Sequence, residues 1–148
     1  MSYLLLKVLH ILFAIVAVGF SISFGIIMAT AAGHLDSTRF ALRLVKRLES
    51  VARVGFIGLI LSGLLLGWMG EVSWHALWFA GSVALSLLAF TVGMTVAVPT
   101  LKAQIALAAQ PTPPLDELKR LAGRSRAVGM TLGLVSLVVL FFMVLKPI

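Results

Sequence analysis

His10 and Met143 carry the side chains best suited to hold an iron cofactor inside a membrane. A neutral imidazole and a thioether can serve as the axial ligands of a b-type haem, and helix bundles build such sites from facing helices. His10 lies near the start of one long apolar run, and Met143 lies near the end of another that should run in the opposite direction. The two side chains should therefore reach similar depths, which makes them a candidate haem b site.

A structural role is the alternative for both residues. A lone transmembrane histidine can hydrogen-bond a backbone carbonyl or a neighbouring helix, and methionine fills irregular gaps in cores. Four more polar side chains should lie near the same end of the bundle, and we call them the outer polar cluster: Lys7, Glu71, His75 and Lys146. No spacing among these residues identifies a catalytic set, so the sequence leaves open whether the chain is an enzyme.

Other site chemistries find little support in the residue types. The chain has no cysteine, which excludes disulfides, thiolate catalysis and iron–sulfur ligation. The three histidines are spread over different levels, so no metal site is expected apart from haem iron. The uncharged segments contain no Asp or Glu, so a carboxylate proton relay has no obvious carrier there.

Composition identifies the chain as an integral membrane protein. Of 148 residues, 61% are hydrophobic and 11% are charged, far from the composition of a soluble domain. The formal net charge of +7 could suggest nucleic acid, but the basic residues lie in short connections and beside helix ends. A membrane orientation explains them better, and no nucleic-acid partner is expected.

Four segments lack charged residues for long enough to cross a bilayer: 11–33, 54–70, 76–101 and 127–145. Around them we predict helices over about 3–32, 37–69, 75–109 and 114–146. The expected fold is all-α, a single transmembrane domain over residues 1–148 forming an up-down-up-down four-helix bundle. The second and fourth helices should extend beyond the bilayer on the cytoplasmic side.

Ten of the twelve Lys and Arg residues fall in the connections after the first and third helices. The positive-inside rule then predicts a bacterial inner-membrane protein with both termini outside the cytoplasm. Four basic residues on one face of the second helix are expected near anionic lipid headgroups: Arg39, Arg43, Lys46 and Arg47.

Small residues at four-residue spacing should let the helices approach closely, because the hydrophobic effect does not drive association within lipid. The first helix has Ala17, Ser21 and Gly25, and the third has Ala89, Gly93 and Ala97. The second and fourth helices have similar stripes. His10 shares the face of Ala17 and Ser21, so it should point into the bundle. Glycine faces left over on the second helix could serve a homodimer or a partner subunit.

Two short motifs carry a resemblance to a known family. They are Leu5-Leu6-Lys7-Val8-Leu9-His10-Ile11-Leu12, followed by Gly19, and Phe142-Met143-Val144-Leu145-Lys146-Pro147. Through them the chain resembles a bacterial family of predicted four-helix integral membrane proteins of unknown function. The likeness extends over nearly the whole length.

The Lys-x-x-His opening is also distantly similar to the membrane protoporphyrinogen oxidases and to the copper-resistance D membrane domains. The oxidase resemblance implies that His10 binds haem b. The oxidase pattern has a lysine early in its third helix and a Pro-Gly-Met stretch in its second. This chain has His75-Ala76-Leu77-Trp78 and Val54-Gly55-Phe56 there, which argues against the oxidase activity.

Three hypotheses for function follow. The first is a non-catalytic four-helix membrane protein or partner subunit, because no convergent catalytic set accompanies His10. The second is a b-type haem-binding redox protein or oxidase that uses His10. The third, transport of a small solute, would need a polar path through the bundle.

Overall fold

The structure is a computed structural model that describes residues 2–31 and 34–146. Its elements are α1 (Ser2–Thr30), α2 (Leu35–Met69), α3 (Leu77–Val92), the π-helical turn η1 (Gly93–Ala97), α4 (Val98–Ala108) and α5 (Leu115–Leu145). No strand occurs in these residues. The predicted end of the first helix at residue 32 and the motif residue Pro147 lie outside the described parts of the chain.

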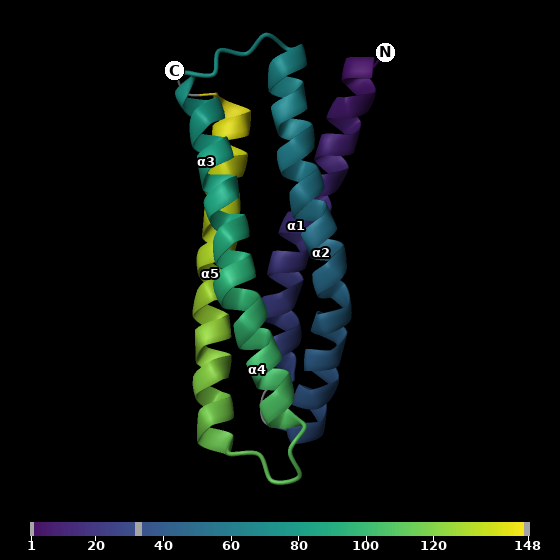
Figure 1. Cartoon of the computed structure of the whole chain (residues 1–148), viewed down its shortest axis with the longest axis vertical. Helices are drawn as coiled ribbons and strands as arrows, with labels where there is room; N and C mark the ends of the chain where they lie inside the picture. Colours follow the sequence, from purple (N-terminus) through teal and green to yellow (C-terminus); the bar gives the residue numbers. More distant parts are fainter. Residues whose placement is uncertain (1, 32–33, 147–148) are drawn as a thin grey trace.

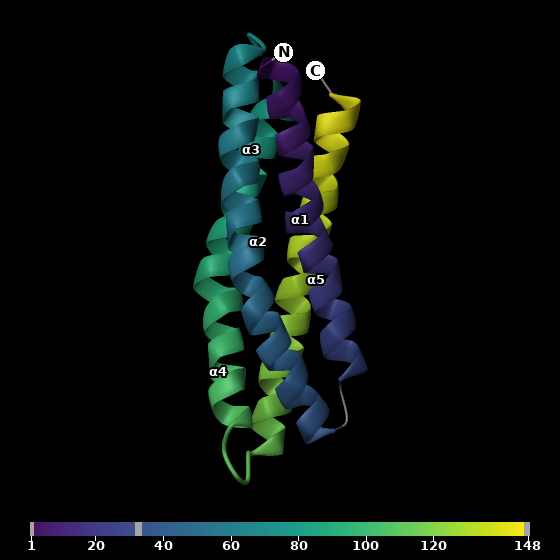
Figure 2. The ribbon, with the colours of Figure 1, turned by 90° about the vertical axis from the view of Figure 1, so that its right-hand side faces the viewer.

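Four helices are long and apolar enough to cross a membrane: Ser2–Thr30, Leu35–Met69, Leu77–Ala108 and Leu115–Leu145. The third of them is α3, η1 and α4 in continuous succession. The prediction of an all-helical protein with four long apolar helices is therefore confirmed. Both termini and the α2–α3 connection lie at one end of the bundle, and the α4–α5 connection lies at the other (Figures 1 and 2).

The π turn η1 ends at Ala97, two residues before Pro99, which lies in the first turn of α4. Proline has no N–H to donate and its ring crowds the carbonyl four residues earlier, so it cannot continue a regular α-helix. The Val98 amide instead donates to the Gly93 carbonyl, five residues back, which defines the wider turn. The long third helix thus passes Pro99 without ending.

The seam between α1 and α2 depends on glycines that face large side chains. A Cβ at Gly55 would lie 2.9 Å from Val16 Cγ1, and one at Gly58 would lie 2.5 Å from the Phe13 ring. The predicted stripe on α1 is only partly used, because Ala17 is fully buried whereas Gly25 faces open space. Close packing of small residues therefore holds this pair together, mostly through α2.

The buried core lies at the end of the bundle that carries the α4–α5 connection. It joins α2, α4 and α5 through Leu42, Val45, Leu101, Ala108 and Leu118. Side chains of α1 pack against it, including Phe24 and Met28. This core fixes the position of the neighbouring part of α2, on which Glu49 lies.

Gly67→Ala should lower the free energy of unfolding by about 1–3 kcal/mol, the range for overpacking a tight contact. The new Cβ would overlap the Phe79 ring, which is 3% exposed and has Trp74 and Trp78 beside it at centroid distances of 5.2 and 5.6 Å. Denaturation in detergent, followed by circular dichroism, measures the loss. Gly133→Ala is the matched control, because Gly133 has no neighbour there.

Candidate functional site

His10 lies on α1 and is half-buried against α2. Its Nδ1 is 2.9 Å from Ser62 Oγ, and Ser62 Oγ donates to the Gly58 carbonyl at 2.5 Å. Because the serine has only one hydroxyl hydrogen, this network assigns Nδ1–H of His10 as the donor to Ser62. The other ring nitrogen, Nε2, then carries the lone pair that could bind a ligand.

Gly63 leaves room for the histidine ring. A Cβ at that position would lie 3.0 Å from His10 Cε1, closer than side chains normally approach. The ring therefore lies on α2 over Ser62 and Gly63, as the helical face of His10 predicts.

The other predicted site residues are not joined to His10 by any hydrogen bond or ion pair in the described part of the chain. Met143 is half-buried on α5, whereas Lys7, Glu71 and His75 are exposed. Lys146 places its ammonium 5.4 Å from the centroid of the Trp78 ring. The outer polar cluster thus forms no network that includes His10.

Ser62→Val should lower the free energy of unfolding by about 1 kcal/mol, the scale of interhelical hydrogen bonds in membranes, because His10 Nδ1 loses its partner. His10→Phe should cost a similar amount, and the double variant should cost less than the sum of the two. Exactly additive losses in a detergent unfolding assay would contradict the hydrogen bond. Ser23→Val, at an exposed position of α1, is the control.

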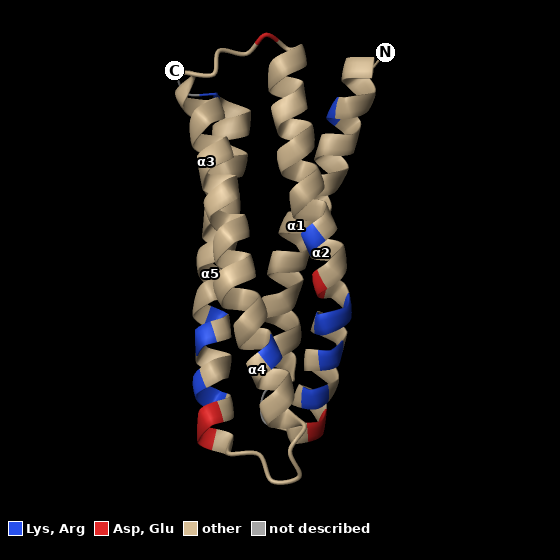
Figure 3. Cartoon of the chain, viewed as in Figure 1, with Lys and Arg blue, Asp and Glu red and all other residues tan. Residues whose placement is uncertain are grey.

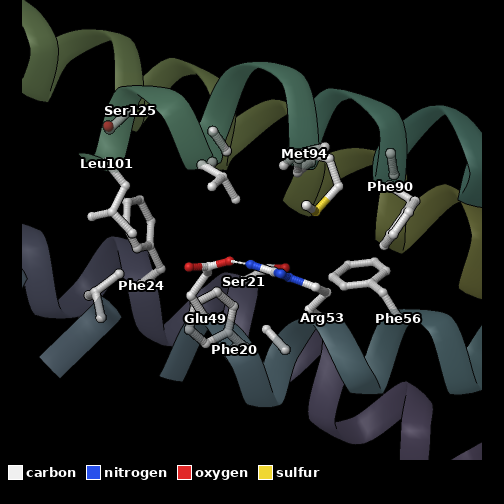
Figure 4. Close-up of a pocket in the computed structure, with 18 residues that line it drawn as sticks. Phe20, Ser21, Phe24, Glu49, Arg53, Phe56, Phe90, Met94, Leu101 and Ser125 are labelled. Atoms are coloured by element: carbon white, nitrogen blue, oxygen red, sulfur yellow. Dashed lines mark hydrogen bonds and ion pairs between the residues drawn. The ribbon is translucent and has the colours of Figure 1, made fainter. Parts of the chain in front are cut away.

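A second candidate site is a cavity of about 120 Å³ between the helices. Figure 4 shows the side chains that line it. Its lining comes from α1, α2, α3, η1, α4 and α5, so all four membrane-crossing helices contribute. Most of the lining side chains are apolar, among them Phe20, Phe24, Phe56, Phe90, Met94 and Leu132. The volume suits a few small groups or a segment of a hydrocarbon chain, and it is too small for a whole cofactor such as haem.

Glu49 is the buried charge beside this cavity. It is 8% exposed, its Oε2 accepts from Lys46 Nζ at 2.7 Å, and its Oε1 pairs with Arg53. In Figure 4 the Glu49 and Arg53 side chains lie together across from Met94. The site therefore combines an apolar cavity with a cluster of three charged side chains on α2, which we call the α2 ion triad: Lys46, Glu49 and Arg53.

Glu49 is not among the predicted site residues because it lies in the basic segment between the first two uncharged segments. A signal was present, since Leu42 and Val45 precede Glu49 by seven and four residues and Ala52 follows it by three. These spacings put all four residues on one helical face, and the structure buries all of them. A carboxylate on a buried helical stripe was the feature that could have revealed the site.

A buried polar pair adjoins the cavity on the side of α4 and α5. Ser125 Oγ, which lines the cavity, donates to Gln104 Oε1 at 2.8 Å. Gln104 is fully buried, and its Nε2 has no hydrogen-bond partner among the described residues. An unpaired buried amide is costly, so this donor is suited to a water molecule or a polar group of a ligand.

The arrangement as a whole is suited to binding. No group of three or more His, Asp or Glu side chains within residues 2–31 and 34–146 could hold a metal ion. Basic residues gather at the end of the bundle that has the α4–α5 connection, along α2, α4 and α5 (Figure 3). Four apolar helices around a cavity, with charge gathered at one end, define an integral membrane protein.

Sequence similarity identifies the family of integral membrane proteins to which this chain belongs. Residues 4–147 match the model of a family described as "Predicted integral membrane protein (DUF2269)", and the chain belongs to this family. The expected membership in a family of predicted integral membrane proteins is confirmed. No curated protein and no solved structure matches the chain.

Proposed function

We propose that this protein is a non-catalytic membrane protein that binds the apolar part of a membrane-soluble ligand in the cavity between its four helices. The observation that carries this proposal is the cavity itself, lined mainly by apolar side chains with a buried carboxylate and its cations at the edge. Ligand sites typically combine an apolar lining with a few polar groups, and this cavity has both.

A photoreactive long-chain alcohol that carries a diazirine tests this proposal. Gly93 lines the cavity and a side chain there would enter open space, so Gly93→Leu should fill the cavity without a clash. Gly133 also faces open space but is not part of the lining, which makes Gly133→Leu the matched control. Labelling of the lining peptides should fall several-fold in Gly93→Leu alone. Equal labelling of both variants would overturn the proposal.

Haem b binding is a second candidate function, favoured by the geometry at His10. The hydrogen bond to Ser62 holds the imidazole so that Nε2 can ligate iron. Phe24 packs over Gly129, and fourteen residues along each antiparallel helix lead from this contact to His10 and Met143. This register puts Met143 at a depth similar to that of His10, so Met143 would be the other residue to hold haem iron. A bound haem would supply one-electron redox chemistry, and His10 would hold it.

An absorption spectrum tests the haem candidate directly. Protein purified in mild detergent from haem-replete cells should show a Soret band that His10→Ala abolishes. Met143→Leu should shift the band while leaving some haem bound. A colourless protein, or a band that survives His10→Ala, would contradict the assignment.

For localisation, we propose the bacterial inner membrane with both chain termini outside the cytoplasm. The support is the gathering of Lys and Arg at the opposite end of the bundle (Figure 3). The basic ends of α2 and α5 would then extend beyond the bilayer on the cytoplasmic side. A phosphatase reporter, active only outside the cytoplasm, should be active when fused to either terminus, and an inactive fusion there would contradict this orientation.

Partners of the bundle are proposed from its surface. The exposed basic residues Arg43, Lys46 and Arg47 are suited to anionic headgroups, whereas Arg39 also binds backbone carbonyls of its own chain. Open faces at Gly25 and Gly133 would permit close approach by a second copy or a partner subunit. The mass of the detergent-solubilised protein distinguishes a dimer from a monomer.

A further inference from the structure

We infer that the ligand of the cavity is an anionic phospholipid, with its phosphate bound by Arg53 and Lys46 and part of an acyl chain in the cavity. This inference rests on the proposed function and names the chemical class of the ligand.

The charge balance of the α2 ion triad is the first reason. Lys46 and Arg53 both pair with Glu49, and Glu49 is the only ion-pair partner of either cation among the described residues. Two cations therefore share one carboxylate, which leaves one positive charge uncompensated beside an apolar cavity. A phosphate diester carries one negative charge and would balance it.

The exposure of the three side chains is the second reason. Those of Lys46 and Arg53 are 43% and 42% exposed, whereas that of Glu49 is 10% exposed. The carboxylate is thus enclosed by its partners, while both cations keep an open side. An incoming anion can bind Arg53 without displacing Glu49. The ion pair with Glu49 fixes the orientation of the Arg53 guanidinium. A fixed guanidinium is well suited to a phosphate because it donates two parallel hydrogen bonds.

The position of Arg53 explains why the ligand should be an amphiphile. Arg53 lies next to Phe56 and Phe90, and Met94 lies across the cavity from it (Figure 4). An anion held by Arg53 would therefore have an apolar cavity directly beside it. A soluble anion would leave that cavity empty, whereas an acyl chain attached to the anion would fill it.

The interface of α2 with α4 explains why the source should be the bilayer. A second hollow lies along this interface towards the basic end, lined by Arg39, Leu42, Arg43, Ile105, Ala108 and Ala109. The interface is thus hollowed both at the cavity and at the level of the basic side chains. A phospholipid with its phosphate at Lys46 and Arg53 and its headgroup directed towards this hollow fits such a path, and the bilayer supplies it at high concentration.

Two photoreactive lipids with the same diazirine-labelled chain test the inference, phosphatidylglycerol and phosphatidylcholine, in vesicles of phosphatidylcholine that contain the full chain. Phosphatidylglycerol should label the lining peptides about tenfold more, the effect expected of one charge-assisted hydrogen bond. Arg53→Gln should reduce its labelling to the phosphatidylcholine level, and Arg53→Lys should restore part of the preference. Lys102→Gln, at an exposed position of α4, should leave this labelling unchanged.

The outcomes separate the inference from the proposed function. Equal labelling by the two lipids would overturn the preference for an anionic phospholipid, while the cavity would remain a ligand site if Gly93→Leu still reduces both. Stronger labelling by a diazirine fatty acid than by phosphatidylglycerol would also overturn the inference, in favour of a free acid. Labelling that Gly93→Leu leaves unchanged would overturn both proposals.

Discussion

Arg39→Ala should lower the free energy of unfolding by about 3 kcal/mol, the sum of two charge-assisted hydrogen bonds after allowance for partial exposure. Arg39 Nε donates to the Ala108 carbonyl at 2.6 Å, and Arg39 Nη2 donates to the Gln110 carbonyl at 2.9 Å. These carbonyls lie at the end of α4, where helical partners are missing. Arg39 therefore joins the start of α2 to the end of α4.

Arg47→Ala is the control for this experiment, because Arg47 is exposed on the same helix and its side chain makes no hydrogen bond within residues 34–146. Arg39→Lys should recover only part of the loss, since an ammonium cannot reach two carbonyls with the planar fork of a guanidinium. Chemical unfolding in mild detergent measures all three variants. If Arg39→Ala and Arg47→Ala cost the same, Arg39 serves lipid contact alone.

Leu42→Ala should lower the free energy of unfolding by about 2–5 kcal/mol. Leu42 is 1% exposed and lies in the core that joins α2, α4 and α5. The truncation leaves a cavity whose walls lose their packing contacts, and this cost does not depend on water. Phe40→Ala removes a larger side chain that is 64% exposed and should cost far less. If the two variants had similar midpoints of chemical unfolding in mild detergent, that result would contradict the position of the core.

The four apolar helices could be predicted because the length of an uncharged segment alone decides whether it can cross a bilayer. The position of Glu49 could not be found this way. A count of charges assigns Glu49 to a basic segment, whereas its burial depends on which face of α2 meets α4 and α1. That face is set by the buried core, which brings together residues far apart in the sequence such as Leu42 and Leu101.

The hydrogen-bond partner of His10 could not be predicted from the sequence either. The helical face of His10 correctly predicted that the ring points inward, but Ser62 is 52 residues away. Choosing it requires the register of α1 on α2, which the glycines at 55, 58 and 63 fix by accepting large side chains of α1. Such a register comes from the fit of two surfaces, and small-residue spacing on each helix alone does not specify it.

The small-residue stripe predicted on the third helix, Ala89, Gly93 and Ala97, is only partly used for packing. Ala89 is buried, whereas Gly93 has open space beside it. The stripe assumes an unbroken α-helix, and η1 lies across it. No spacing rule for a regular helix can hold through a turn of different width.

A single extra residue in η1 changes the rotational phase of everything that follows it by about 100°. If residues 89–108 formed a regular α-helix, Leu101 and Ala108 would lie on a different face from the buried Ala89. With the wider turn they return to it, and both are buried. Deleting one residue between 93 and 97 would therefore give a regular α-helix in which Leu101, Gln104 and Ala108 point away from their neighbours. The number of residues in this segment thus matters to the packing of the bundle as much as their identity.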